Sequence, residues 1–102
     1  MKLEHENLED LKRKILEIVG RHVDLKSHRV FFFGSRVNGK SRESSDIDVG
    51  VEGEHALPAG VLSDIQDEME NLPVLYKIDV VDFATVNEKF KKIAKERVEL
   101  VN

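Results

Sequence analysis

Residues 31–51, FFFGSRVNGKSRESSDIDVGV, contain two overlapping patterns, each of which could bind a nucleoside triphosphate. Residues 34–41 match G-x-x-x-x-G-K-S, the phosphate-binding loop in which backbone amides and a lysine hold the phosphates. The G-S pair at residues 34–35, separated by ten residues from D-I-D at residues 46–48, matches a pattern of metal-dependent nucleotidyl transfer. The two patterns predict that different bonds of the triphosphate are broken.

The two aspartates of the D-I-D pattern are suited to holding a metal ion. Residues two apart in a strand point to the same face, so Asp46 and Asp48 should project side by side. Two carboxylates about 4 Å apart repel each other by about 4 kcal/mol at an effective dielectric constant near 20, so they need a compensating positive charge. Mg²⁺ supplies that charge and binds one or two protein carboxylates together with substrate phosphates. A polar edge strand facing water is the alternative explanation for this pair taken alone.

A third aspartate strengthens the metal-site hypothesis. Asp79 lies in the apolar run at residues 78–81, where an unpaired carboxylate would be costly to bury. If this strand lies beside the other acidic strand, Asp79 joins Asp46 and Asp48 on one face of the sheet. Three carboxylates can hold two metal ions about 3.5–4 Å apart, the spacing used in phosphoryl-type transfer. Asp82 is a rival ligand, but strand periodicity directs it to the opposite face, and its place at the strand end favours a turn or capping role.

The elements that position these residues follow from the spacing of the apolar side chains. Apolar residues at helical spacing predict amphipathic helices, and short β-branched or aromatic runs predict strands. Helices are predicted over residues 6–21, from Pro58 to Leu72 and from Asn87 to Val101, strands over residues 30–33, 46–51 and 76–82, and a loop over residues 34–45 with room for one helical turn. This order predicts an α/β (α+β) fold with a small mixed sheet of about three strands flanked by about four helices. All 102 residues are expected to form a single domain.

The same order of elements decides between the two patterns. A phosphate-binding loop runs directly into a helix whose N-terminal amides face the phosphates. Here only residues 42–45 separate Ser41 from the next predicted strand, which is too short for a crossover helix of roughly 10 residues. Three strands are also too few for the usual doubly wound sheet. We therefore favour metal-dependent transfer and keep a P-loop NTPase as a remote alternative.

Composition and charge limit the class of protein. Apolar residues make up 40% and charged residues 35% of the chain, as in a soluble globular protein, and the absence of cysteine excludes disulfides and thiolate zinc sites. The net charge of −4 argues against a surface that binds long nucleic acid by itself. No segment resembles a signal peptide or a membrane span, so we expect a cytoplasmic location and no membrane partner.

A local basic group lies between the two glycines and the acidic pair. Arg36, Lys40 and Arg42 stand close together in the sequence, beside Asp46 and Asp48. A site for a metal ion and a polyphosphate needs such a juxtaposition of charges. For each basic residue taken singly, an ordinary solvated loop explains the sequence equally well.

Together these residues resemble the minimal nucleotidyltransferases (MNT) of the polymerase-beta-like superfamily. The resemblance rests on G-S at residues 34–35, D-I-D at residues 46–48 and I-D-V at residues 78–80, and it covers nearly the whole chain. The stretches FFFGSRVNGKS, SDIDVGV and YKIDVVDFATVNEKF are similar to the bacterial and archaeal forms that are paired with HEPN proteins. The resemblance implies the nucleotidyltransferase fold with its polymerase-beta-like palm.

The resemblance also implies which residues bind the nucleotide. Gly34 would let the backbone approach the triphosphate, and Ser35 would offer a hydroxyl and an amide to a phosphate oxygen. Arg36 and Arg42 would balance charge on the phosphates, although either residue could instead order the loop.

The catalytic and metal-binding residues implied by the resemblance are the three aspartates. Asp46 and Asp48 would hold two Mg²⁺ ions, with Mn²⁺ as a substitute, and Asp79 would hold the catalytic ion and help to deprotonate the incoming hydroxyl. The expected reaction is attack of an acceptor hydroxyl on the α-phosphate of a nucleoside triphosphate, with ATP as the substrate and pyrophosphate as the leaving group.

Family resemblance further implies a protein partner. Related MNT proteins act as antitoxins that transfer AMP to a tyrosine of a HEPN toxin, so a helical HEPN protein from the same operon is the expected partner, with a homo-oligomer as an open alternative. A different class of function also stays open: a binding module that keeps the fold and neutralises a partner by contact alone. Three intact acids favour the enzyme, because a pure binder has no need to cluster like charges.

Overall fold

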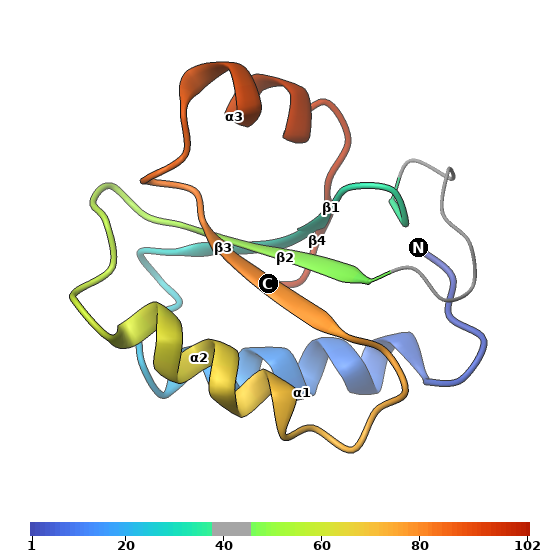
Figure 1. Cartoon of the computed structure of the whole chain (residues 1–102). Coiled ribbons are helices and arrows are strands. Elements are labelled where there is room, and N and C mark those ends of the chain that lie inside the picture. Colours follow the sequence, from blue (N-terminus) through green and yellow to red (C-terminus); the bar gives the residue numbers. More distant parts are fainter. Residues whose placement is uncertain (38–45) are drawn as a thin grey trace.

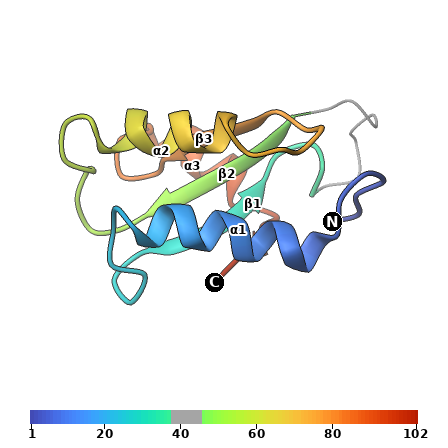
Figure 2. The same cartoon turned by 90° about the horizontal axis from the view of Figure 1, so that it is seen from below.

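The computed structural model describes residues 1–37 and 46–102, which form a mixed sheet with helices on both faces (Figure 1). The elements in chain order are α1 (Leu8–Gly20), β1 (Arg29–Phe33), β2 (Ile47–Glu52), α2 (Val61–Glu70), β3 (Ile78–Asp82), α3 (Glu88–Ala94) and β4 (Glu99–Leu100). α1 and α2 lie side by side against one face, as the view from below shows (Figure 2), and α3 covers part of the other face. No helix in residues 1–37 or 46–102 is long and apolar enough to cross a membrane.

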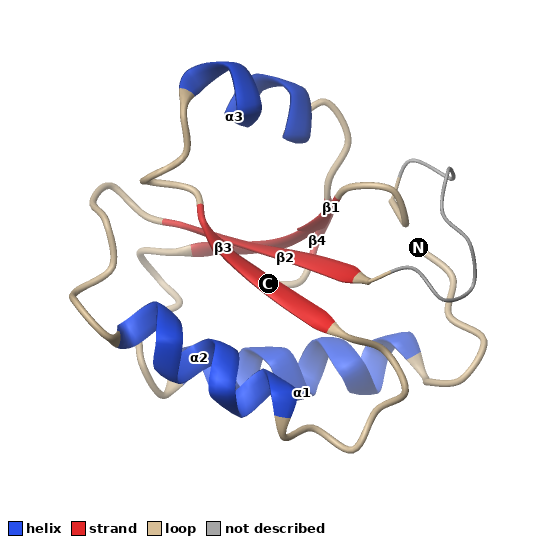
Figure 3. Ribbon diagram, viewed as in Figure 1, coloured by secondary structure: helices blue, strands red, loops and turns tan. Residues whose placement is uncertain are grey.

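The four strands are arranged in the order β3-β2-β1-β4 (Figure 3). β1 pairs with both β2 and β4 in antiparallel orientation, whereas β2 pairs with β3 in parallel orientation. The parallel pair requires a crossover connection, and α2 provides it. The two strands that carry the predicted acidic residues are therefore direct neighbours.

The main core fills the space between the sheet and the two helices α1 and α2. Strand residues of alternating position, such as Val30, Phe32 and Val49, point into it and meet the buried stripe of α1 and residues Ile65 and Met69 of α2. These five side chains are almost fully buried. Because strand side chains alternate between faces, this arrangement leaves the even-numbered positions of β2, Asp48 among them, on the side of α3.

A smaller aromatic cluster lies on the α3 side of the sheet. Phe31 and Phe33 of β1 contact Phe83 in edge-on geometry, with ring centroids 4.9 and 5.0 Å from that of Phe83. Gly50 of β2 lies beneath these rings, and a Cβ at that position would approach Phe31 to 2.6 Å and Phe83 to 2.8 Å. Phe90 of α3 adds a fourth ring at 6.2 Å from Phe33. This cluster therefore connects α3 to the centre of the sheet.

The mixed α/β fold class predicted from the sequence is confirmed, with one difference at the C-terminal end. The predicted last helix continues to Val101, but α3 ends at Ala94 and the chain then returns as β4 along the edge of β1. The amide of Val101 donates to the carbonyl of Val30 at 2.9 Å, and the Val101 side chain is buried in the main core rather than on a helical stripe. In the part of the chain that the structure describes, there are thus four strands where about three were expected and three helices where about four were expected.

Candidate active site

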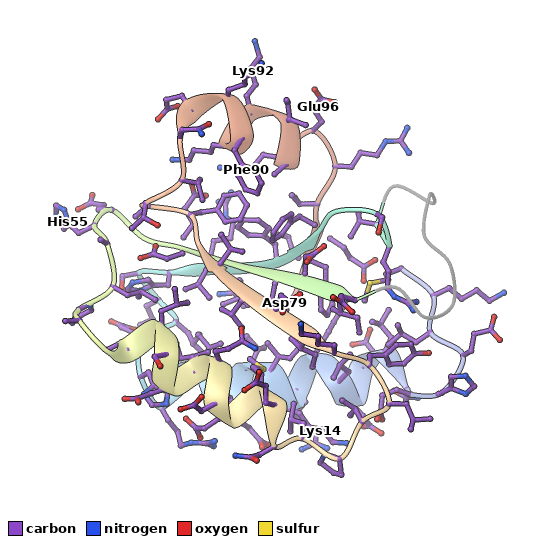
Figure 4. The ribbon with its side chains drawn as sticks, in the orientation of Figure 1. Lys14, His55, Asp79, Phe90, Lys92 and Glu96 are labelled. Atoms are coloured by element: carbon purple, nitrogen blue, oxygen red, sulfur yellow. The ribbon has the colours of Figure 1, made fainter. Side chains whose placement is uncertain are left out.

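The parallel pairing of β2 and β3 brings two of the predicted acidic residues together. The register aligns Asp48 directly with Asp79, and both side chains lie on the α3 face of the sheet, as strand alternation requires. Figure 4 labels Asp79 on the edge strand β3. Partial burial, followed by the negative charges of Asp79 and Asp46, raises the pKa of Asp48 above its ordinary value of 3.8. The carboxylates therefore lie close enough to repel one another, as the sequence predicted.

The turn after β1 brings the backbone against the same carboxylate. Gly34 has a φ of +84°, and a Cβ at this position would lie 2.4 Å from Oδ2 of Asp48. Only glycine fits here, because both the left-handed backbone and the close approach exclude a side chain. The amide of Val37 donates to the carbonyl of Gly34 at 3.1 Å, so Gly34 begins a tight turn that includes Ser35. Gly34 and the acidic strand thus meet in space as well as in the motif.

Asp46 completes the acidic group from a more exposed place. It immediately precedes β2, and its charge contributes to the raised pKa of Asp48. Within residues 1–37 and 46–102, however, no three His, Cys, Asp or Glu side chains are arranged as a set of metal ligands. The donor chemistry still fits a hard divalent cation, since all three groups are carboxylates and their mutual repulsion is what a cation relieves. Lys77, with Nζ 3.9 Å from Oδ1 of Asp79, is a nearby positive charge.

A cleft of about 800 Å³ opens between the sheet and α3 beside these residues. Gly34 and Asp48 form part of one wall, and Phe90 and Ile93 of α3 and Arg97 form part of the other. Figure 4 shows Phe90 pointing from α3 toward the sheet. A cleft of this size, mainly apolar with a few charged groups, is suited to a small-molecule ligand. This wall could not be predicted from the sequence, because the apolar residues of α3 are also explained by ordinary packing.

Arg36 packs against Tyr76. Its side chain is buried, and its guanidinium carbon is 4.6 Å from the centre of the Tyr76 ring. The Tyr76 hydroxyl in turn accepts hydrogen bonds from the amides of Glu4 and His5, at 2.9 and 3.0 Å. This placement is what the loop-ordering role for Arg36 requires. The other predicted loop residues, Lys40 and Arg42, lie outside the described residues.

Asp82 has the structural role that its position predicted. It is 5% exposed on the face opposite Asp79, and its carboxylate accepts the amides of Leu57 at 2.8 Å and Ala84 at 3.0 Å. Its carbonyl also accepts the Thr85 hydroxyl and amide. Asp82 therefore stabilises the turn after β3 through hydrogen bonds to backbone groups.

The sequence that carries these residues matches a known protein family. The family described as "Polymerase beta, Nucleotidyltransferase" matches residues 13–102, which contain all the motif residues discussed above. Among curated proteins, the chain is 28% identical over 89 residues to the "Probable protein adenylyltransferase MntA" of Haemophilus influenzae, a match that covers 85% of this chain and 78% of the relative.

Solved structures with low sequence identity share the fold. One is described as a toxin-antitoxin crystal structure with AMP-PNP: its TM-score is 0.72 at 16% identity, and the match covers 89% of this chain and 72% of the other. Another is the tri-AMPylated HEPN toxin of Shewanella oneidensis in complex with the MNT antitoxin, with a TM-score of 0.64 at 15% identity, covering 93% of this chain and 72% of the other. At identities of 16% and 15%, these similarities show a shared fold.

Proposed function

The chain belongs to the polymerase beta nucleotidyltransferase family, and from this premise we propose that it transfers AMP from ATP to an acceptor hydroxyl and releases pyrophosphate. The observation that carries the proposal is the alignment of Asp48 with Asp79 on one sheet face, with Gly34 pressed against Asp48 at the edge of a cleft. Neither a purely structural sheet nor a contact-only binder needs this concentration of like charge beside an open cleft.

The three aspartates are proposed to hold Mg²⁺. Asp48 in β2 and Asp46, the residue before β2, would supply carboxylate oxygens, and Asp79 would supply its own from the neighbouring strand. Bound divalent ions would polarise the phosphates and neutralise the charge that develops during transfer. A carboxylate oxygen of Asp79 would take the proton of the acceptor hydroxyl. The hydroxyl oxygen would then bond to the α-phosphorus while the bond from that phosphorus to pyrophosphate breaks.

The residues of the β1–β2 connection are proposed to bind the triphosphate. Gly34 lies at the edge of the cleft beside Asp48, and the neighbouring Ser35 would offer its hydroxyl and amide to a phosphate. Arg42 is assigned to the phosphates on the family resemblance, whereas Arg36 is assigned to holding this turn in place, on the support of its contact with Tyr76.

The proposed acceptor belongs to a helical HEPN-type protein, which would make this chain the antitoxin of a pair. Support comes from the names of the relatives, an adenylyltransferase in one case and an MNT antitoxin bound to an AMPylated HEPN toxin in the other. The rim of the cleft also carries large exposed apolar side chains, Phe90 and Ile93 of α3 at 41% and 59% exposure, that a protein partner would cover.

Labelled ATP tests the reaction class. The protein and the product of its neighbouring gene are incubated with Mg²⁺ and ATP labelled at either the α- or the γ-phosphate. We expect transfer from the α position alone, with loss of transfer when EDTA removes the metal. Transfer or release of the γ label alone would instead support a P-loop NTPase, and absence of any transfer, with intact complex formation, would support the contact-only binding module.

A further inference from the structure

Asp79 lies on an edge strand whose outer side is met by the side chain of Gln66. Among the described residues, β3 is the last strand of the sheet, so no strand pairs with the outward backbone groups of Ile78 and Val80. Gln66 of α2 meets both of them: its Nε2 donates to the carbonyl of Ile78 at 2.8 Å, and its Oε1 accepts the amide of Val80 at 2.8 Å. The side-chain amide thus makes the pair of hydrogen bonds that a further strand would make.

The two backbone groups that Gln66 bonds belong to Ile78 and Val80, the residues immediately before and after Asp79. Backbone groups of successive strand residues point alternately to the two sides of the strand. The carbonyl of Lys77 accepts the amide of Ile47 toward β2 at 2.8 Å, so the groups of Ile78 and Val80 point away from β2 and those of Asp79 point toward it. The backbone at Asp79 is therefore held on the inner side by β2 and on the outer side by Gln66.

Gln66 is itself rigidly placed. Its neighbour in the helix, Ile65, is fully buried in the main core, so α2 cannot rotate without opening that core. Glutamine is the residue that supplies one donor and one acceptor at this reach, since asparagine is shorter by one methylene and glutamate has no donor.

We propose that Gln66 is a positioning residue for Asp79, which fixes the direction of the Asp79 carboxylate by holding the edge strand on both sides of it. The inference rests on the proposed function insofar as Asp79 acts in transfer. A carboxylate on a fraying edge strand would sample several directions, and a displacement of about 1 Å in an active site can cost about a hundredfold in rate.

The test compares Gln66→Met with a stability-matched control. Methionine keeps the length and helix propensity of glutamine but offers neither hydrogen bond. Ile65→Val removes one buried methyl group from the same helix and leaves the backbone of β3 untouched. Both variants are measured together with wild type for thermal midpoint, for amide hydrogen exchange at Val80, and for kcat and KM in the transfer assay at saturating Mg²⁺, with the partner present.

We expect Gln66→Met to accelerate exchange at Val80 and to lower kcat by at least about tenfold relative to Ile65→Val at a similar thermal midpoint, with little change in KM for ATP. Gln66→Glu, which keeps the acceptor for the Val80 amide but loses the donor, should fall between wild type and Gln66→Met. Equal kcat in Gln66→Met and Ile65→Val would overturn the proposal. If wild type transfers no label, the proposed function fails separately. Unchanged amide exchange at Val80 in Gln66→Met would then show that Gln66 does not hold the edge strand.

Discussion

Asp48 is the residue in which the demands of folding and of the proposed chemistry oppose each other most directly. Burial and the charges of Asp79 and Asp46 raise its pKa, which means that the ionised carboxylate is less stable in the folded chain than in the unfolded chain. A carboxylate in such a place lowers the stability of the folded chain. The cost is explained if a cation and a polyphosphate occupy the site during function.

Asp48→Asn separates the two demands. We expect transfer to fall by at least about a thousandfold, equivalent to roughly 4 kcal/mol of lost transition-state stabilisation, because a metal ligand is removed. The apo variant should nevertheless be as stable as wild type or more so, since the substitution relieves repulsion. Transfer assays and urea unfolding measure the two effects. Full activity in Asp48→Asn would rule out the metal assignment.

The stability difference should also depend on pH in a defined direction. Because the folded pKa of Asp48 is raised, the unfolded chain loses its proton first as the pH rises above 3.8, and wild-type stability falls until the folded pKa is passed. The stability advantage of Asp48→Asn should therefore be complete above the folded pKa and vanish as the pH drops below 3.8.

Asp82→Asn is the control for the acidic site. It should lose about 1–3 kcal/mol of stability, because a buried acceptor of two amides is altered, and it should affect transfer far less than Asp79→Asn.

Gly34→Ala tests the close approach of the turn to Asp48. The new methyl group would clash with the Asp48 carboxylate and would also require a positive φ, which costs alanine about 1–2 kcal/mol. We expect a comparable loss in the free energy of unfolding and a loss of transfer of at least about tenfold. Gly60→Ala is the matched control, since Gly60 has a φ of +86° but a Cβ there has open space. Equal activity in the two variants would show that the contact with Asp48 is unimportant.

Much of the acidic site could be predicted from the sequence because it depends on strand periodicity. The spacing of Asp46 and Asp48 and the isolation of Asp79 in an apolar run were sufficient to predict a shared face, and the opposite phase of Asp82 predicted its separate role. Gln66 could not be found in this way. Its role depends on where α2 lies relative to the sheet edge, and a single glutamine on a helix gives no sign of that.

At the scale of elements, α3 is held to the sheet differently from the other helices. None of its residues is buried, and its contacts with the sheet include Phe90 and Ala94 against the aromatic cluster. Glu52 of β2 also forms ion pairs with Lys91 at 3.1 Å and with Lys95, the residue after the helix, at 2.8 Å. The burial of Glu52 opposes its ionisation, yet its hydrogen bonds to Lys95 and Lys91 and their charges hold its pKa below 4.5. α3 is thus a wall of the cleft that is held by ion pairs as well as by aromatic contacts.

Glu52→Gln should loosen this wall without unfolding the protein. We expect faster amide exchange in α3 and a global stability loss of no more than about 1 kcal/mol, because partly exposed ion pairs contribute little. Because the folded pKa of Glu52 is lowered, its contribution is present above pH 4.5 and is lost as the pH falls through the folded pKa. High salt should reproduce the effect in wild type. Unchanged exchange in α3 would mean that the aromatic contacts alone hold the helix.

The C-terminal elements show where sequence periodicity was insufficient. Ile93, Val98 and Val101 continue an apolar spacing that fits one helix, but α3 ends at Ala94. What decides the outcome is the free edge of β1, whose carbonyl at Val30 is satisfied by the returning chain. An ion pair adds to this: Glu99 of β4 lies 3.2 Å from Lys12 of α1. These interactions are between distant parts of the chain and override local helix preference.

At the scale of the whole molecule, the cleft is covered on one side by α3 and bordered by exposed apolar residues. Phe90 and Ile93 of α3 line the cleft and are 41% and 59% exposed. Val98 and Leu100, in the segment that follows α3, are also exposed. In an open cleft, water weakens the electrostatic stabilisation that transfer needs. A second protein could supply the missing cover.

We therefore expect a complex with the helical product of the neighbouring gene. Co-expression followed by size-exclusion chromatography with light scattering should give one peak that contains both chains, and Ile93→Glu should weaken this complex by at least about tenfold, because a charge would be buried at the interface. Lys92→Glu is the control, since Figure 4 shows Lys92 pointing away from the sheet. Two separate peaks at micromolar concentration, with full transfer activity in the peak of this chain alone, would show that no partner is required.

The packing of Tyr76 also provides a built-in optical signal. It is the only tyrosine of a chain without tryptophan, so it dominates the intrinsic near-ultraviolet fluorescence of the free protein. Arg36 lies against its ring, and Arg36 belongs to the turn that begins at Gly34 and Ser35. Any ligand that shifts this turn should change the emission of Tyr76. Nucleotide and metal titrations can therefore be followed in the unlabelled protein, and Arg36→Lys, which weakens the stacking, provides the calibration for that signal.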